Sequence, residues 1–395
     1  MIDLLFKNAI ILSDNQARPI FKSNSLGINQ GKIAVLNRKT LPAKKIIDLK
    51  GKMVIPGLIN CHTHAAMNAF RGLADDLPLK IWLEKHIWPT EKKLLSPAFV
   101  KKWTKQACAE MATGGTTCFS DMYFFEEWAS KAARQFGLRM VAGEAILDLR
   151  PESLELTKNL LESRSEPLTT ISIAPHSTYS VGEERLIQAK ALADKYNVKL
   201  TIHAAETKNE QNDVSYLNKI GILDENTILI HAIWVNDREI DILAKKQVKI
   251  VHCPQSNMKL ASGIAPIAKM LQAGITVGLG TDGAASNNSL DMFREMKAAA
   301  LLAKVSALDP TVLTAKTVFE MATINAAKVL GLEQETGSLE FGKSADFAIL
   351  DFKKPHLTPV YDYFSHLVYA CEASDVVATY VAGKKIYQDD RSKFS

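Results

Sequence analysis

The stretch VIPGLINCHTH, residues 54–64, is an apolar run that ends in two histidines, His62 and His64. Side chains alternate along a β-strand, so these two imidazoles would point to the same side and could bind one metal ion. Neutral imidazole is a preferred nitrogen ligand of zinc. A single pair of this kind is a weak signal. Its meaning depends on whether other strands supply further ligands.

Short apolar runs alternate with amphipathic helical patterns over residues 56–332, which we take as one domain. The apolar runs end near Asn60, Ser120, Ala145, Ala174, Ile202, Ile230, Val251 and Gly280. The helical patterns cover about 97–113, 126–136, 152–163, 183–196, 211–220, 236–246, 263–273 and 288–304. Eight strands separated by helices predict an α/β fold of the (β/α)₈ TIM-barrel type. A doubly wound sheet is the alternative, and it usually has fewer strands. One closing helix is expected over 315–330.

The two ends of the chain differ from this middle part. Residues 1–55 and 333–395 are rich in short strand patterns separated by glycine turns, at 3–12, 25–29, 32–35, 45–48, 346–351, 376–382 and 385–387. Neither end shows a long helical pattern. We therefore predict a small β-sandwich domain built from both termini.

Composition excludes several classes of protein. The 395 residues include 48 basic and 43 acidic side chains, a net charge of +5 that is scattered without blocks, which argues against nucleic-acid binding. No apolar run is long enough to cross a membrane, so no membrane association is expected. The five cysteines are widely spaced with no CxxC, which favours reduced thiols. With no basic region at the N-terminus to suggest a secretory signal, the expected location is the cytoplasm. The sequence leaves open whether the protein forms a homo-oligomer.

Polar side chains follow most of the predicted barrel strands. Six of the nine histidines and one aspartate lie at strand ends: His62, His64, His176, His203, His231, His252 and Asp282. Any one of them alone is better explained as a core or capping residue. Together they indicate a functional site, because TIM barrels build their active sites at the carboxyl ends of their strands.

Four stretches carry a resemblance to a known family: PGLINCHTH (56–64), HAAE (203–206), His231 and GTDGAASNN (280–288). They resemble the amidohydrolase superfamily, in its mononuclear-metal aminohydrolase branch. Within that branch the chain looks most like the 5-methylthioadenosine/S-adenosylhomocysteine deaminases. The resemblance covers almost the whole chain, including GSLEFGKSADFAILD (337–351) near the C-terminus.

The resemblance implies one divalent metal ion as cofactor, with zinc the expected ion. Its ligands would be His62, His64, His203 and Asp282. Such a set leaves a position open for water, as a catalytic site requires. Dinuclear members carry a bridging lysine on the fourth strand. No lysine stands near the end of that strand here, which favours a single ion.

The resemblance also implies a reaction and three catalytic residues. Metal hydroxide would attack the amino-bearing carbon of a purine nucleoside, and ammonia would leave. Asp282 would take a proton from the attacking water. Glu206 would protonate the ring nitrogen and move protons to the leaving ammonia, and His231 would stabilise the developing oxyanion. Base deaminases of another fold also combine zinc hydroxide with a non-ligand glutamate.

Residues for substrate binding follow from the same resemblance. Trp82 would pack on the nucleoside, Glu91 would bind the ribose hydroxyls, and His176 would contact the ribose or purine side. The alternative for residues 79–91 is a surface amphipathic helix with Trp82 in the core.

The chain departs from the family at the position of one substrate-binding arginine. Relatives that accept S-adenosylhomocysteine carry arginines after strand three and in the next loop, to bind its carboxylate. Here Glu144 takes the first position, and Arg150 is the candidate for the second. A carboxylate facing a carboxylate is repulsive. We therefore expect methylthioadenosine, adenosine or another 5′-modified adenosine to be preferred over S-adenosylhomocysteine.

Two alternatives stay open from the sequence. A guanine, pterin or s-triazine hydrolase of the same superfamily would share the metal centre and differ in its pocket. A catalytically silent barrel that serves as a binding or scaffold protein would lose metal ligands, and this chain retains the full set. Metal analysis separates the enzyme from the scaffold.

Overall fold

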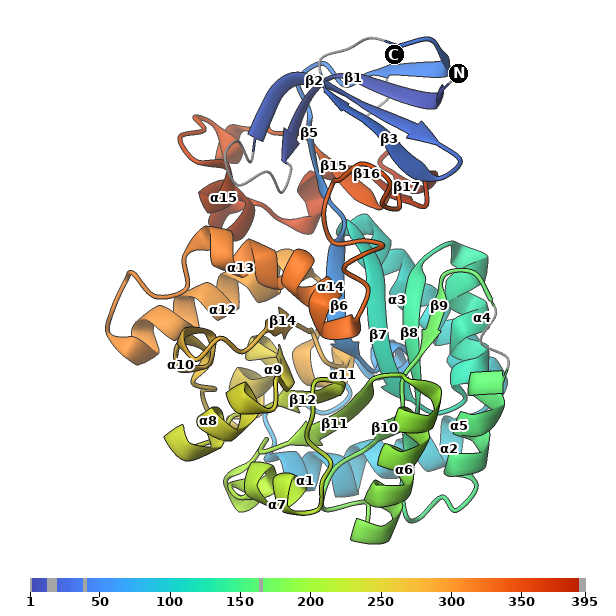
Figure 1. Cartoon of the computed structure of the whole chain (residues 1–395), viewed down its shortest axis with the longest axis vertical. Coiled ribbons are helices and arrows are strands. Elements are labelled where there is room, and N and C mark those ends of the chain that lie inside the picture. Colours follow the sequence, from blue (N-terminus) through green and yellow to red (C-terminus); the bar gives the residue numbers. More distant parts are fainter. Residues whose placement is uncertain (1, 13–19, 38–40, 163–165, 391–395) are drawn as a thin grey trace.

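The computed structural model describes residues 2–12, 20–37, 41–162 and 166–390. A barrel of strands surrounded by helices forms the larger part, and a β-sheet containing both ends of the chain covers one end of it (Figure 1). Among the described residues, no helix is long and apolar enough to span a membrane.

The barrel strands are parallel and follow one another in chain order. They are β6 (Leu58–Thr63), β7 (Thr116–Tyr123), β8 (Arg139–Ile146), β9 (Thr169–Ile171) with β10 (Ala174–Pro175), β11 (Leu200–Ala204), β12 (Thr227–His231), β13 (Lys249–His252) and β14 (Val277–Leu279). They form two sheets, β6 to β10 and β11 to β14. Where β10 meets β11, parallel bridges between Ile173 and Leu200 and between Ser177 and His203 connect the two sheets. Where β14 meets β6, a hydrogen bond of 3.0 Å from Asp282 N to His62 O connects them and closes the barrel. The predicted TIM-type barrel is confirmed.

Helices surround the barrel close to their predicted positions (Figure 1). They are α3 (Pro97–Thr113), α4 (Glu126–Phe136), α5 (Ser153–Glu162), α6 (Glu183–Tyr196), α7 (Asp213–Lys219), α8 (Asp237–Lys245), α10 (Ile267–Gln272) and α12 (Met292–Ala307). Local signals fix several ends. The Ser96 side chain caps α3 ahead of Pro97, and Asn236 forms a capping box with Glu239 at the start of α8.

Three helix predictions were wrong in their boundaries, and the one over 263–273 begins only at Ile267. The helix expected over 288–304 starts later, at Met292, because the Asp291 side chain caps it by accepting from Phe293 N. The helix expected over 315–330 is two helices, α13 (Ala315–Met321) and α14 (Ile324–Leu330). They break at Thr323, whose backbone is not helical (φ −135°, ψ −101°) and whose hydroxyl donates to Phe319 O.

Several short elements were not predicted, or, over residues 79–91, were expected only as an alternative. They are η1 (Ala65–Phe70), α1 (Leu79–Trp82), the π-helical turn η2 (Leu83–Ile87), α2 (Trp88–Leu94), η3 (Lys208–Glu210), α9 (Pro254–Lys259), α11 (Ala284–Asn287), η4 (Pro355–Leu357), α15 (Tyr363–Ser365), η5 (His366–Ala370) and η6 (Ala373–Asp375). Those that follow β6, β13 and β14 lie at the barrel end that carries the strand-end histidines. They therefore build the surroundings of the candidate site.

The terminal sheet combines strands from both ends of the chain, as predicted. They are β1 (Ile2–Leu12), β2 (Ile20–Asn29), β3 (Lys32–Asn37), β4 (Ala43–Asp48), β5 (Met53–Pro56), β15 (Phe347–Leu350), β16 (Val376–Val381) and β17 (Lys384–Gln388). The order is β17-β16-β15-β5-β1-β2-β3, with β4 also paired to β1. The central strand β5 runs directly into the first barrel strand, β6. The domain boundaries after residues 55 and 332 remain predictions.

A buried arginine joins the barrel to the terminal sheet. Arg139, at the start of β8, contacts Asp346 Oδ2 through Nε at 3.1 Å and Glu335 Oε1 through Nη1 at 2.8 Å. The side chain of Asp346 is fully buried, whereas that of Glu335 is 54% exposed. Because a buried ion pair is costly to break, this contact ties the two parts of the molecule together.

Candidate metal centre and active site

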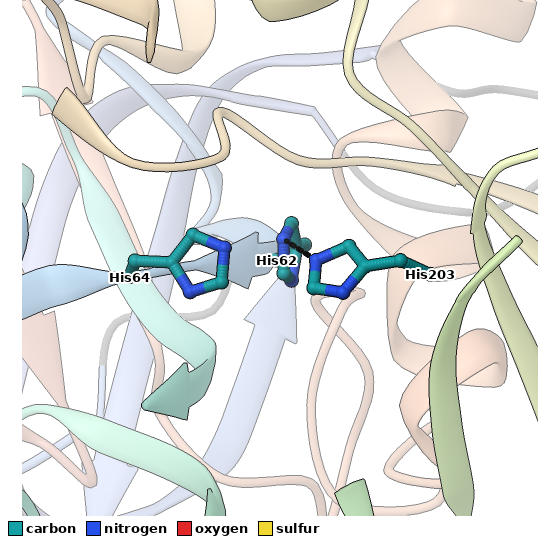
Figure 2. Close-up of side chains that lie close together, drawn as sticks. All are labelled: His62, His64 and His203. Atoms are coloured by element: carbon teal, nitrogen blue, oxygen red, sulfur yellow. Dashed lines mark hydrogen bonds between the residues drawn. The ribbon is translucent and has the colours of Figure 1, made fainter. Parts of the chain in front are cut away.

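Three histidines converge at the carboxyl end of the barrel. His62 and His64 lie on or directly after β6, and His203 lies on β11, across the barrel (Figure 2). Their ligand nitrogens all lie within 4.8 Å of one another. The Nε2 atoms of His62 and His203 are 3.1 Å apart. The spacing of His62 and His64 therefore places both imidazoles on the same site, as the sequence predicts.

Backbone carbonyls orient two of these rings. The Nδ1 of His64 donates to Met122 O at 2.5 Å, and the Nδ1 of His203 donates to His176 O at 2.8 Å. A carbonyl oxygen can only accept, so each Nδ1 carries a hydrogen, and Nε2 is left as the nitrogen that each ring can offer to a metal ion. Hydrogen bonding of this kind to the second nitrogen is typical of metal-binding histidines.

Asp282 adds a carboxylate to the histidine group. Its Oδ1 lies 3.4 Å from His62 Nε2 and 3.2 Å from His64 Nε2. Its Oδ2 accepts hydrogen bonds from Ser256 at 2.6 Å and from Ser286 at 3.0 Å. The backbone of Asp282 is left-handed (φ 61°), a conformation that a non-glycine residue adopts at a cost. The fold therefore holds this carboxylate in place against local strain.

The donor set fits one four-coordinate divalent ion. Zinc binds nitrogen and carboxylate ligands at 2.0–2.2 Å, so two ligands on neighbouring corners of a tetrahedron are about 3.3 Å apart. The distances of 3.1, 3.2 and 3.4 Å between the ligand atoms of the four residues agree with this value. Three imidazoles and one carboxylate can fill these four corners, and a water molecule would then be a fifth ligand.

The charge states of three of the four residues suit metal binding, whereas at His64 burial is outweighed by the hydrogen bond and charge of Asp282, which raise the pKa to about 9. Burial lowers the pKa of His62 to about 4, against the opposing effect of Asp282. Burial and the neighbouring histidines hold the pKa of His203 well below its ordinary value. Burial raises the pKa of Asp282, but hydrogen bonds and charge from His62 and His64 outweigh it and leave that pKa well below its usual range. His62 and His203 are therefore neutral and Asp282 is ionised.

Glu206 and His231 lie beside this group. Glu206 Oε2 is 3.8 Å from His231 Nε2, and both side chains are buried. Burial raises the pKa of Glu206, and the nearby His231 partly offsets this. The other ring nitrogen of His231 contacts Asn257 Oδ1 at 2.8 Å. Burial therefore makes this carboxyl group easier to protonate than a solvated glutamate.

Two of the expected substrate-binding residues lie close to the three histidines of the candidate metal site. The His176 ring centroid is 4.9 Å from that of His203, and its Nδ1 is bound by Ser180 Oγ at 2.9 Å. Glu91, on α2, accepts a 2.5 Å hydrogen bond from the hydroxyl of Tyr123. The Tyr123 ring lies 6.1 Å from that of His64, which places Glu91 at the margin of the site.

The other expected substrate residues have partners within the protein. Trp82 is buried in the main hydrophobic core, as the alternative for this segment had it. Glu144 is 2% exposed and accepts from Glu126 N at 2.9 Å and from Arg150 Nη1 at 3.1 Å. The guanidinium of Arg150 also lies over the Phe124 ring, 4.6 Å from its centroid. Glu144 and Arg150 therefore neutralise each other.

Sequence reasoning missed Tyr123, Ser256 and Asn257. Tyr123 ends β7, so its place at a strand end could have indicated it. Ser256 and Asn257 lie on the short helix α9 after β13, and they reach Asp282 and His231 at the ends of the two neighbouring strands. No spacing in the sequence indicates such contacts between loops.

Comparisons with known proteins agree with this geometry. The model of the amidohydrolase family matches residues 53–386. The 5-methylthioadenosine/S-adenosylhomocysteine deaminase of Thermodesulfovibrio yellowstonii is 42% identical over 97% of this chain and 93% of its own. A 5′-deoxyadenosine deaminase of Methanothermobacter thermautotrophicus is 43% identical over 93% of this chain and 90% of its own.

A solved structure extends the likeness to three dimensions. The adenosine deaminase of Xanthomonas campestris with bound zinc superposes with a TM-score of 0.95 at 33% identity, over 97% of this chain and 92% of that one. Both the family model and the relatives cover nearly the whole chain. The protein belongs to the amidohydrolase family.

Proposed function

We propose that the protein is a metal-dependent hydrolytic deaminase of a 5′-modified adenosine. The observation that carries the proposal is one site that combines a metal-binding group of three histidines and Asp282 with a buried glutamate, Glu206, and His231. The relatives named as deaminases of methylthioadenosine and 5′-deoxyadenosine support this substrate class.

The proposed cofactor is one zinc ion held by His62, His64, His203 and Asp282. When bound, it would lower the pKa of a water molecule towards neutrality and supply hydroxide. Zinc in the related adenosine deaminase structure supports the choice of metal. All five cysteines are unpaired, which supports the expected cytoplasmic location.

Two side chains would move protons, and a third would stabilise charge. The ionised carboxylate of Asp282 accepts the proton of the attacking water. Glu206, whose pKa is raised by burial, donates to the ring nitrogen next to the reacting carbon and then carries a proton to the departing ammonia. His231 stabilises negative charge that develops on the attacking oxygen, with its ring oriented by Asn257.

The proposed nucleoside-binding residues are Glu91, His176 and Trp82. Glu91 would accept from the ribose hydroxyls with the oxygen that Tyr123 does not occupy. His176 presents its Nε2 side, since its Nδ1 is bound by Ser177 and Ser180. Trp82 is buried in the hydrophobic core, where it would support the segment that carries Glu91.

The proposed preference is for 5′ groups without a carboxylate, such as those of methylthioadenosine, adenosine and 5′-deoxyadenosine. Arg150 is paired with Glu144 at 3.1 Å and with Glu152 at 3.1 Å, so its charge is already balanced. A substrate carboxylate would meet a guanidinium that two carboxylates already engage rather than a free cation. Equal kcat/KM for methylthioadenosine and S-adenosylhomocysteine would refute this preference.

Metal content and ammonia release test the proposal together. About one zinc ion per chain and ammonia release from a 5′-modified adenosine are the expected results. The screen includes guanine and cytosine, and release from guanine alone would favour the alternative aminohydrolase. A metal-free, inactive protein would favour the scaffold alternative.

Glu206→Gln tests the catalytic assignment. The variant should keep its metal and lose about 10²- to 10⁴-fold in kcat, because the general acid is gone while the shape is kept. Glu184→Gln on the outside of α6 is the matched control and should be fully active. An active Glu206→Gln enzyme would remove Glu206 from its proposed role.

A further inference from the structure

Residues 71–94 form a segment that lies at the barrel end opposite the terminal sheet (Figure 1). Its helices α1 and α2 lie after residue 78. It carries Trp82 and Glu91, two of the proposed nucleoside-binding residues. Its first part, residues 71–78, has no regular secondary structure. The position of Glu91 therefore depends on what fastens this segment to the barrel.

Besides the ion pair of Arg71 with Glu110 of α3 at its start, side-chain bonds fasten the segment on two sides of the barrel mouth. On one side, Glu91 accepts from Tyr123 at the end of β7. On the other side, Asp75 Oδ1 accepts from Lys259 Nζ at 2.6 Å, and Asp75 Oδ2 accepts from Asn288 at 3.2 Å. Lys259 ends α9 and Asn288 follows α11, so the second attachment lies on the loops after β13 and β14.

Lys259 is built into this second attachment. Its ammonium group has three donors. They are matched by three acceptors: Asp75 Oδ1, Asn288 Oδ1 and Ala285 O. The side chain of Lys259 is 23% exposed, whereas the lysine of a comparable surface pair, Lys269 with Asp237, is 61% exposed. A saturated, partly buried ammonium holds a loop more firmly than a solvated one.

The same short helix contacts the reaction centre. Two other α9 residues bond to proposed catalytic residues. Ser256 donates to Asp282, and Asn257 accepts from His231. Lys259 therefore connects the wall that carries Glu91 to the helix that orients two proposed catalytic residues.

We propose that Lys259 is a positioning residue for nucleoside binding, which holds residues 71–94 closed over the site through Asp75. The inference rests on the proposed function and deepens it, since it names what keeps the ribose-facing wall in place. Without the attachment, the segment spends part of its time away from the barrel, and the apparent affinity for the nucleoside falls by that fraction. The metal ligands and Glu206 are untouched, so the chemical step should change little.

Steady-state kinetics of Lys259→Met and Asp75→Asn test this proposal. KM for the adenosine substrate should rise by about 5- to 30-fold, with kcat changed by no more than about threefold, as expected for the loss of one coupled charge pair. The charge-swapped variant Asp75→Lys with Lys259→Asp should recover part of the loss. Lys269→Met breaks an ion pair of the same 2.6 Å length on the outside of the barrel and should behave as wild type.

Hydrogen exchange supplies a readout that needs no turnover. Peptides covering residues 71–80 should exchange faster in Lys259→Met and in Asp75→Asn than in the wild type and in Lys269→Met. If KM and exchange both stay unchanged, or if kcat falls while KM does not, the positioning role is wrong. If no adenosine is deaminated at all, the proposed function fails, while faster exchange still supports the attachment.

Discussion

The hydrogen bond between Asn257 and His231 allows a sharp test of the proposed catalytic centre. Asn257→Ala removes the Oδ1 that lies 2.8 Å from His231 Nδ1, and both residues are 1% exposed. Water cannot easily replace the lost acceptor at so buried a position. The imidazole then has an unsatisfied nitrogen and no group that fixes its orientation.

The expected loss follows from the burial of this pair. A buried donor left without a partner costs about 1–3 kcal/mol. If that cost falls on the transition state, in which His231 stabilises charge, kcat decreases by about 5- to 150-fold. Metal content should not change, because His231 is not among the proposed ligands. Asn257→Asp keeps an acceptor oxygen at the same place and should retain most of the activity.

Ammonia release at saturating substrate and metal analysis of each variant measure these effects. Asn226→Ala, which removes a hydrogen bond to Lys199 at the opposite end of the neighbouring strands, serves as control. The reasoning would be refuted by an Asn257→Ala enzyme whose kcat is within twofold of wild type. It would also fail if the activity loss were matched by loss of metal, since Asn257 would then act on the ligands.

Two further predictions concern stability. Arg139→Met should lower the free energy of unfolding by about 3–5 kcal/mol, because Asp346 is left charged and buried, whereas Glu335→Gln at the exposed end of the same cluster should cost about 1 kcal/mol or less. Equal urea midpoints for the two variants would contradict this ranking. Burial raises the pKa of Asp213 to about 6 from an ordinary 3.8, so the folded protein binds this proton more tightly and stability falls as the pH rises from about 4 to about 6. In the Asp213→Asn variant, the free energy of unfolding should fall by about 3 kcal/mol less than in the wild type over this pH range. Parallel plots of that free energy against pH for variant and wild type would contradict the prediction.

Periodic patterns made most of the fold predictable. Helices α3, α4 and α6 have the predicted boundaries, because their apolar faces repeat at helical spacing and their ends carry caps. The break at Thr323 was not predictable, because threonine is tolerated in helices and the apolar pattern continues past it. The hydrogen bond from its hydroxyl to Phe319 O is visible only in the structure. A helix over 79–91 was expected only as an alternative, because this segment is not part of the regular alternation of barrel strands and helices.

The candidate site also contains residues that the sequence predicts and residues that it does not. Residues at the ends of strands, such as His62 and Asp282, could be predicted because parallel strands bring their carboxyl ends together. Partners such as Ser256 for Asp282 depend on the path of a loop and its distance from another loop. For Glu144, the sequence predicted a charge at the substrate, and the structure instead engages both of its oxygens with Glu126 N and Arg150.

The strand that leads into the metal site has a consequence for synthesis of the chain. β5 lies between β1 and β15, and Ile55 pairs with Ala348. At the usual speed of translation, roughly 5–20 residues per second, β5 waits on the order of 15–60 seconds for β15 to be made. During that time its free edge is open to pairing with other nascent chains. The yield of folded enzyme should therefore depend on the last strands of the chain, which take no part in the chemistry.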